Sequence, residues 1–274
     1  MNSHNLYDAG APARPLAGKA QVYRVAFLTI LIREIRRFLR IWKQTLLPSV
    51  ITTFLYFTIF GNLIGNRIGE MDGIPYISFI VPGLIMMSVI TNSFGNVVSS
   101  FFGSRFQKNI EEMLTAPLPP WVIIAGFVAG GAARGLCVAV IVTAVSAVFT
   151  PPQVHHAGLL IVTVVMCAIL FAQAGLINAL FAKNFDDINI IPMFILTPLT
   201  YLGGVFYSIK ELPVFWQGVS KANPLLYMIN SFRYAMLGKS DVDVSLAQFV
   251  IFLANVILFA VSYWLIRTSR RLKE

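Results

Sequence analysis

Long uncharged stretches alternate with short charged segments along this chain of 274 residues. A helix needs about 20 apolar residues to cross the hydrocarbon core of a bilayer, and several of the stretches reach that length. The pattern therefore predicts an all-α membrane protein with six transmembrane helices. The predicted spans cover residues 45–64, 76–102, 121–149, 158–182, 188–207 and 245–266.

A two-faced helical pattern precedes the first span, over residues 22–43. On one side, apolar residues recur at three- and four-residue steps, namely Ile35, Phe38, Leu39, Trp42 and Leu46. The other side carries Arg33, Arg36, Arg37, Arg40 and Lys43. This pattern is typical of a helix that lies in the membrane interface with its basic face toward anionic lipid. A helix packed on a soluble partner is the alternative, but the span that follows at once favours the interface. Residues 1–21, rich in Ala, Gly and Pro, are predicted to be a mobile cytoplasmic tail.

The segment 212–237 does not fit a simple span. It is fairly apolar, but Pro213 and the pair Asn223–Pro224 interrupt it, and it carries Lys221 and Arg233. Proline breaks the ladder of helical hydrogen bonds, and non-helical backbone at membrane depth must be surrounded by protein or water. We therefore expect two short half-helices that dip into the membrane from the outer side and return. They would form a re-entrant helical hairpin before the last span.

Composition supports the membrane class. Hydrophobic residues make up 57% of the chain, the mean hydropathy is +0.74, and only 12% of the residues are charged. A soluble domain carries about 25% charged residues, so this chain has too few to coat a soluble globule. The net charge of +9 could indicate nucleic-acid binding. The basic residues, however, lie at the ends of apolar segments, where they meet anionic lipid head groups. Nucleic acid is therefore not expected as a partner.

The distribution of Lys and Arg predicts the orientation of the chain. Basic residues gather on the cytoplasmic side of a membrane protein. With the N-terminus inside and six spans, most Lys and Arg residues fall inside, including the C-terminal group at 267–273. A seventh span at 225–237 would place that group outside. Six spans with both termini in the cytoplasm are therefore predicted.

The inner loop between the second and third spans, residues 105–120, is a candidate functional segment. One face of a short helix there would carry Phe106, Ile110 and Met113 or Leu114, before a group of three prolines ends it. Two interpretations stay open: the loop docks in a groove of a partner protein, or it is a solvated helix without a partner. The candidate residues are Arg105, Phe106, Lys108, Ile110, Glu111, Glu112 and Leu114.

Arg134 is the one charged residue inside the third predicted span. It lies roughly 20 Å along the helix from Trp121 and therefore near the middle of the membrane. Four glycines surround it at spacings that allow close helix packing, namely Gly126, Gly130, Gly131 and Gly135. Arg134 could contact an anionic group of a substrate. A structural tether to carbonyls or to a carboxylate is favoured, because any charge inside a membrane needs partners.

Lys183, Asp186 and Asp187 share a very short inner loop. Two carboxylates are too few ligands for a metal site, so a solvated turn is expected. The pair His155–His156 and the two cysteines do not add a ligand set either. We expect no metal site and no catalytic residue.

A phosphate-binding loop would need a glycine-rich segment that ends in Gly-Lys-Ser or Gly-Lys-Thr. Gly238-Lys239-Ser240 comes nearest, but Arg233 stands in place of the first glycine and the site would face outside. ATP binding is therefore not expected on this chain, and energy would come from another chain or from an ion gradient.

Several stretches occur in an order that resembles the membrane subunit, or permease, of a type-2 ABC exporter. A basic amphipathic helix precedes six spans, FIVPGLIMMS at 79–88 resembles the second span of that family, and 105–119 resembles its coupling-helix loop. Three further stretches resemble the C-terminal signature region of that family. They are AKNFDDI at 182–188, which is followed by Pro192, LGGVFYS at 202–208 and NPLLY at 223–227. The resemblance covers nearly all of the chain from about Val22 onward.

The resemblance implies a half-channel that works as a homodimer in the bacterial inner membrane, driven by two copies of a separate ATP-binding subunit. ATP and Mg²⁺ would bind that subunit, and no cofactor would bind this chain. Residues 105–115 would be the coupling helix, and the turn at Lys183 would lie near the ATPase. Family members export polysaccharides, lipids, drugs or peptides. The apolar, aromatic-rich spans favour an amphipathic or lipid-like substrate that leaves the cytoplasm.

An ion-gradient-driven carrier or a channel without an ATPase is the alternative class. Such proteins often carry acidic residues inside the membrane or internal repeats. No Asp or Glu falls within the six predicted spans, and no repeat is evident. A membrane anchor for a larger assembly is a third possibility, but it would not require the proline-broken outer segment. The exporter is therefore preferred to both.

Overall fold

The structure is a computed structural model that describes residues 18–110, 113 and 118–268. The first part of the chain forms α1 (Lys19–Arg40), α2 (Trp42–Thr45), α3 (Leu47–Tyr56), the π-helix η1 (Phe57–Ile64) and α4 (Gly65–Ile68). A small antiparallel hairpin, β1 (Glu70–Met71) and β2 (Ile74–Pro75), leads into α5 (Tyr76–Phe106), α7 (Pro120–Ser146) and α8 (Ala157–Phe181). The last part forms α9 (Asp187–Ile191), the π-helix η2 (Pro192–Leu196), α10 (Thr197–Leu202), the 3-10 turn η3 (Ile209–Glu211), α11 (Val214–Lys221), α12 (Pro224–Leu237) and α13 (Val244–Thr268).

Five helical stretches among the described residues are long and apolar enough to cross a membrane. They are Trp42–Gly61, Tyr76–Phe106, Pro120–Ser146, Ala157–Phe181 and Val244–Thr268. They correspond to the first four predicted spans and to the last one, so the all-α membrane fold is confirmed. The predicted fifth span, 188–207, is instead a shorter apolar helix, Asp187–Leu202, followed by an irregular segment. The count of six spans therefore stays a prediction.

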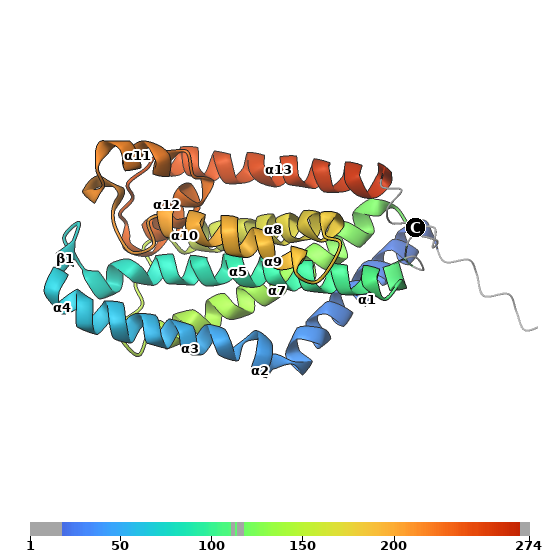
Figure 1. The fold of residues 1–274 in the computed structure, drawn as a ribbon, viewed down its shortest axis with the longest axis horizontal. Helices are drawn as coiled ribbons and strands as arrows, with labels where there is room; N and C mark the ends of the chain where they lie inside the picture. The colour runs from blue at the N-terminus through green and yellow to red at the C-terminus, as the bar shows by residue number, and fades with distance from the viewer. Residues whose placement is uncertain (1–17, 111–112, 114–117, 269–274) are drawn as a thin grey trace, which may run out of the picture.

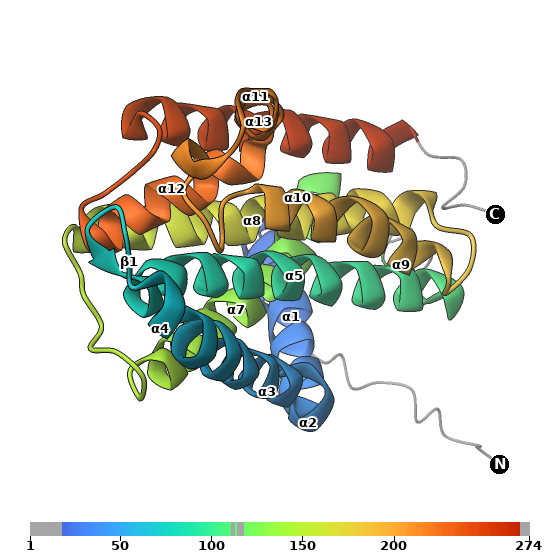
Figure 2. The same ribbon diagram turned by 60° about the vertical axis from the view of Figure 1, so that its left-hand side comes forward.

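Helix α5 is the centre of the bundle. It packs against α7, α8 and α12, and 78% of its most apolar stretch is buried within the chain. The corresponding fraction for α13, which lies along the outside of the bundle, is 11% (Figures 1 and 2). Large side chains of α5 such as Phe79, Met86, Phe94 and Phe101 are fully buried. The chain thus builds its core around its second span.

Helix α1 packs along α7 at two glycines. A Cβ added at Gly126 would stand 2.7 Å from Ile30 Cγ2, and one added at Gly130 would collide with the side chain of Glu34. Small residues at four-residue spacing let two helices approach closely, because no side chain separates the backbones. The predicted interface helix is therefore not free on its surface but is seated on the third span.

The other two glycines of the same group, Gly131 and Gly135, lie on the side of α7 that faces α5. A Cβ at Gly131 would collide with Val97, and one at Gly135 would collide with the hydroxyl of Ser93. The pattern that predicted close packing thus serves two interfaces at once. Helix α7 is held between α1 on one side and α5 on another.

The bundle has two distinct ends. Helix α1, the last turn of α5, the turn between α8 and α9 and the end of α13 lie at one end, here called the α1 end (Figure 1). The β1–β2 hairpin, α4 and the start of α5 lie at the other, here called the hairpin end. The first four long helices run in alternating directions between the two ends, the shorter helix Asp187–Leu202 returns to the hairpin end, and α13 again runs toward the α1 end.

The segment 212–237 holds two helices, α11 and α12, as its proline pattern predicted. They meet at Asn223, whose side chain accepts a hydrogen bond from Leu225 N at 3.0 Å and donates one to Leu199 O at 2.6 Å. The first bond caps α12 and the second fixes the joint against α10. Their re-entry into the membrane from the outer side stays a prediction.

The first span and the short helix Asp187–Leu202 each contain a π-helical turn, η1 and η2. The hydroxyls of Tyr56 and Tyr201, which flank these turns, lie 3.0 Å apart. Phe206 stacks on Phe60 with the ring centroids 4.8 Å apart. These contacts join α3 and η1 to the segment that follows η2.

We expect Gly130→Ala to destabilise the protein, because the added Cβ displaces the backbone of α1 at Glu34. Overpacking of this kind costs about 1–3 kcal/mol. Gly95→Ala on α5 is the matched control, since a Cβ there meets nothing within 4 Å and alanine favours a helix. Thermal unfolding of the detergent-purified variants would show a lower midpoint for Gly130→Ala only. Equal midpoints for the two variants would contradict the close contact between α1 and α7.

Candidate functional site

Helix α5 carries a row of polar residues at four-residue spacing. They are Ser88, Asn92, Asn96, Ser100 and Ser104. Residues four apart lie on the same face of a helix, so the row forms a polar stripe along this span. The contacts below show that three of these side chains form hydrogen bonds with polar groups of α1, α3 and α7.

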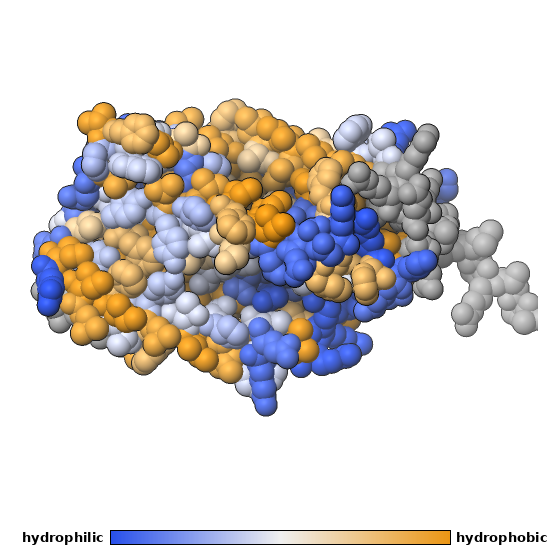
Figure 3. All heavy atoms as spheres, viewed as in Figure 1, coloured by the Kyte–Doolittle hydropathy of each residue, from blue (hydrophilic) through white to orange (hydrophobic). Residues whose placement is uncertain are grey.

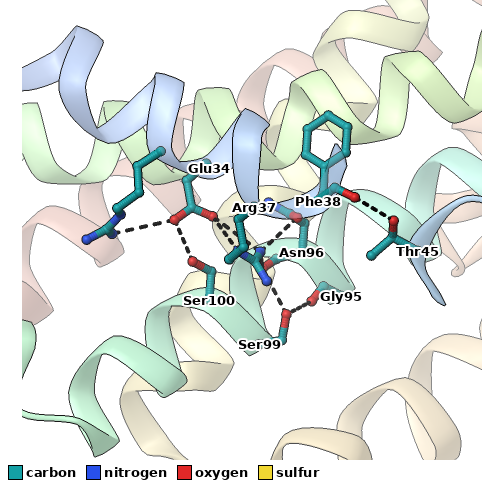
Figure 4. A network of polar contacts seen from close by, with 9 residues as sticks. Glu34, Arg37, Phe38, Thr45, Gly95, Asn96, Ser99 and Ser100 are labelled. Carbon is teal, nitrogen blue, oxygen red and sulfur yellow. Dashed lines mark hydrogen bonds and ion pairs between the residues drawn. The ribbon is translucent and has the colours of Figure 1, made fainter. Parts of the chain in front are cut away.

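Glu34 of α1 lies at the centre of a buried polar network (Figure 4). Its side chain is fully buried and accepts a hydrogen bond from Ser100 Oγ at 2.6 Å. Arg33 Nη2 lies 3.5 Å from one carboxylate oxygen, and Arg37 Nη2 lies 3.2 Å from the other. A buried carboxylate is stable only when hydrogen bonds and cations replace its water. The network supplies both.

Arg37 connects this carboxylate to the backbone of α5. Its Nη2 donates to both the carbonyl oxygen and the side-chain Oδ1 of Asn96, each at 2.9 Å. The Arg33 guanidinium lies over the ring of Phe127 of α7, 5.3 Å from the ring centre. Arg33 and Arg37 of the basic face thus have protein partners, and the orientation of that face toward lipid stays a prediction. The single acidic residue among the arginines, Glu34, was the signal that the pattern analysis did not use.

A groove of about 900 Å³ runs beside this network, between α1 and the end of α5. Arg33, Arg36, Arg37 and Arg40 of α1 line one wall, and residues from Ser99 to Asn109 line the other. Hydrophilic residues gather over α1 and the neighbouring end of the bundle, whereas hydrophobic residues cover much of the remaining face (Figure 3). The groove is therefore a strongly basic depression at the α1 end.

Arg134 contacts protein groups from two other elements. Its Nη2 donates to Thr45 O of α2 at 3.1 Å and to Asn92 Oδ1 of α5 at 3.0 Å. Asn92 in turn donates to Ser49 Oγ of α3 at 3.0 Å. These bonds join the start of the first span to α5 and α7. They match the interpretation of Arg134 as a structural tether to protein groups. Arg134 Nε has no hydrogen-bond partner among the described residues.

Arg105 belongs to the last turn of α5 and not to a separate loop. Its Nη1 donates to Leu180 O and Ala182 O, each at 3.0 Å, and to Ala179 O at 3.4 Å. The last carbonyls of a helix have no partner within that helix, and a cation placed there satisfies them. Arg105 therefore caps the end of α8 and fixes it to the end of α5.

Phe106 and Ile110 do not share a face. Phe106 is 66% exposed and Ile110 only 2%. Helix α5 ends at Phe106 and the chain turns at Lys108, which has a positive φ of 61°, so the helical periodicity does not continue. Glu111, Glu112 and Leu114 of the predicted coupling segment lie outside the described residues.

An aromatic cluster joins the end of α5 to the α8–α9 turn. The Phe185 ring lies edge-on to Phe106 at 5.1 Å and to Phe102 at 4.9 Å between centroids. Phe106 and Phe185 are both more than half exposed. An exposed aromatic pair beside a charged loop is typical of a surface that binds a protein partner. The two rings therefore mark a candidate contact surface at the α1 end.

The candidate turn Lys183–Asp187 is exposed and held by local bonds. Lys183 N donates to Asp187 Oδ2 at 2.8 Å, and Asp186 N and Asp187 N both donate to Asn184 Oδ1. The two carboxylates do not converge with further ligands: in the ranges that the structure covers, no group of three or more His, Cys, Asp or Glu could hold a metal ion.

The hairpin end holds a second buried cation that the sequence analysis did not single out as a site. Arg233 of α12 is 2% exposed, stands over the ring of Phe79 at 4.0 Å and donates to Gly204 O. Nearby, Lys239 Nζ donates to Asp72 O. The lysine of the Gly238-Lys239-Ser240 stretch thus holds a loop, in keeping with the rejection of a phosphate-binding loop there.

Glu34→Gln would loosen α1 from the bundle, since it removes the charge that holds Arg33 and Arg37 in place. Leaving buried polar groups poorly paired costs about 1–3 kcal/mol. The midpoint of thermal unfolding should fall, whereas Glu70→Gln, the same change at an exposed carboxylate of the hairpin end, should leave it unchanged. An unchanged midpoint for Glu34→Gln would show that the network does not hold the helix.

Comparison with known proteins agrees with this architecture. The model of the ABC-2 type transporter family matches residues 25–237. The chain is 57% identical to the inner membrane transport permease YadH of Escherichia coli K12 over 253 residues, which cover 92% of this chain and 99% of that protein. It is 27% identical to nodulation protein J of Rhizobium leguminosarum bv. viciae over 233 residues, 82% of this chain and 89% of that protein. The five long apolar helices and the likeness to an inner-membrane permease support a multi-pass location in the inner membrane. The chain therefore belongs to the ABC-2 type transporter family, as a permease subunit.

Proposed function

We propose that this chain is the membrane-spanning half of an ATP-driven exporter, and that two copies of it work with two copies of a separate ATP-binding subunit. ATP and Mg²⁺ bind to that subunit, which carries out the hydrolysis, and this chain holds no cofactor. Membership of the ABC-2 type transporter family supports the pairing with an ATP-binding subunit. The homodimer rests on the resemblance described above.

The α1 end faces the cytoplasm in this proposal. Basic residues of α1, the end of α5, the α8–α9 turn and the end of α13 all lie at that end, as expected of a cytoplasmic face. The start of α1 and the end of α13 both lie at that end (Figure 1), which supports cytoplasmic termini.

The observation that carries the proposal is that the end of α5, from which the loop 105–120 continues, is bonded to both α1 and α8. Arg105 fixes the end of α5 to the end of α8, and the Glu34 network fixes α5 to α1. A push on the loop by the ATP-binding subunits therefore reaches α1, α5 and α8 together and not one helix alone. The exposed rings of Phe106 and Phe185 provide apolar contact beside the charged residues of the loop.

In the resulting cycle, closure of the two ATP-binding subunits pushes on the loops of both copies, and the two bundles rock against each other. The movement releases the substrate to the outside. The apolar, aromatic-rich spans favour an amphipathic or lipid-like molecule, with drugs and glycans as further classes. Interaction with membrane lipid is part of the same proposal.

Gentle purification of the tagged protein from its own membranes should recover a P-loop ATPase at near-equal stoichiometry. Family membership gives the physical reason, because a permease of this type gains its energy from such a subunit. Mass spectrometry of the purified complex measures the ratio. Repeated absence of an ATPase, even after cross-linking at residue 111, would favour an ion-gradient-driven carrier instead.

Glu111→Lys combined with Glu112→Lys should lower the amount of co-purified ATPase by about tenfold or more, because reversing charges at an interface opposes like charges. Transport should fall in parallel. Glu70→Lys combined with Glu211→Lys makes the same charge change at exposed positions of the hairpin end and should have no effect. If association and transport survive the change at 111 and 112, these residues are not the coupling contact.

A further inference from the structure

We propose that the groove between α1 and the end of α5 is a binding site for the phosphate-bearing head group of an anionic lipid, held by Arg36 and Arg40. The inference does not rest on the ATP-driven cycle, because it concerns binding alone. It also differs from a diffuse attraction of the whole basic face of α1, since it assigns the binding to two residues and one depression.

The four arginines of the groove divide into two pairs. Arg33 and Arg37 are engaged by the buried carboxylate of Glu34, at 3.5 and 3.2 Å. Arg36 and Arg40 are exposed, line the same groove and form no ion pair within the described part of the chain. The network thus supplies a fixed wall, and the second pair supplies positive charge that a ligand can neutralise.

The opposite wall adds neutral hydrogen-bonding groups. Ser104 is the last member of the polar row on α5, lines the groove and is only partly buried. Its hydroxyl makes no hydrogen bond within the described residues, so it is free to donate to an oxygen of a ligand. Guanidinium groups with a hydroxyl opposite them suit phosphate oxygens, which accept several hydrogen bonds at once.

The surroundings of the groove indicate a lipid as the source of the phosphate. Ile32 and Ile41 line the groove and are exposed, at 45% and 38%. Trp42, which follows, is 49% exposed, and tryptophan is enriched at the level of lipid head groups. An acyl chain could lie along these apolar residues while the phosphate occupies the basic groove. A free phosphate ion would not use this apolar border.

Arg36→Gln combined with Arg40→Gln tests the site. The purified protein would be titrated with phosphatidylglycerol or phosphatidylcholine in detergent, and bound lipid counted by native mass spectrometry. Wild-type protein should prefer phosphatidylglycerol, and the variant should lose about tenfold or more of that affinity, as two basic residues contribute to anionic-lipid binding. Arg36→Lys with Arg40→Lys keeps the charge and should retain most of it.

Lys19→Gln combined with Arg24→Gln is the matched control. Both residues are exposed on α1 and outside the groove, so the change removes the same charge from the same helix. It should lower the affinity by less than about threefold. Equal losses in the two variants would overturn the site in favour of diffuse attraction. If neither variant lost affinity for phosphatidylglycerol, the proposal that the groove binds an anionic lipid would be overturned.

A competition experiment separates the two sources of phosphate. Glycerol 3-phosphate presents the head-group chemistry without acyl chains and should not displace phosphatidylglycerol at equal concentration. Displacement would overturn the assignment to a lipid, because the groove would then recognise a soluble phosphate ester. Each variant is first compared with wild type by thermal unfolding, and both arginines are exposed, so folding is expected to be unaffected.

Discussion

A carboxylate buried beside a membrane-spanning helix must have partners, and Glu34 obtains all of them from a fixed arrangement of α1 on α5. In a low-dielectric environment, an unpaired charge or polar group is far more costly than in water. The bond from Ser100 to Glu34 and the two bonds from Arg37 to Asn96 cross between the helices and therefore leave little freedom in how α1 is placed on α5. Gly130 is part of the same constraint, because only glycine leaves room for the Glu34 side chain against α7.

The polar row of α5 extends this constraint along the span. Asn96 and Ser100 form hydrogen bonds with α1, and one turn earlier in the helix Asn92 accepts a hydrogen bond from Arg134 and donates one to Ser49. The chain is thus fixed at two successive levels as it passes from the interface helix into the first span. Since α5 is also the most buried of the long helices, the entry segment is attached directly to the core. Movement of α1 relative to α5 would have to break several charge-assisted bonds together.

Hydropathy alone was sufficient to place the long helices, because each needs an apolar stretch of about bilayer length and little else. It could not place Arg105, which looks like a loop residue but is drawn into α5 by the carbonyls at the end of α8. A helical pattern also shows which residues share a face without showing what that face meets. The pattern of α1 therefore predicts a basic face but not the bonds that Arg33 and Arg37 make with Glu34 and Asn96. The fifth span was overestimated because its apolar sequence continues past Leu202 into a loop, where the paired glycines Gly203 and Gly204 end the helix.

The two π-helical turns give the first span and the segment of η2 a property that α5 lacks. A π turn closes its hydrogen bonds one residue further along the chain than an α turn, so it holds one surplus residue. Deleting a residue within Phe57–Ile64 can convert part of that turn to α-helix while the flanking helices keep their orientation. The same deletion in α5 would rotate every following side chain by about 100° relative to the preceding ones and so move the polar residues after it away from their partners. The first span can therefore lose a residue near the contact between Tyr56 and Tyr201. In α5 the number of residues is fixed by the bonds of Asn92, Asn96 and Ser100 to their partners.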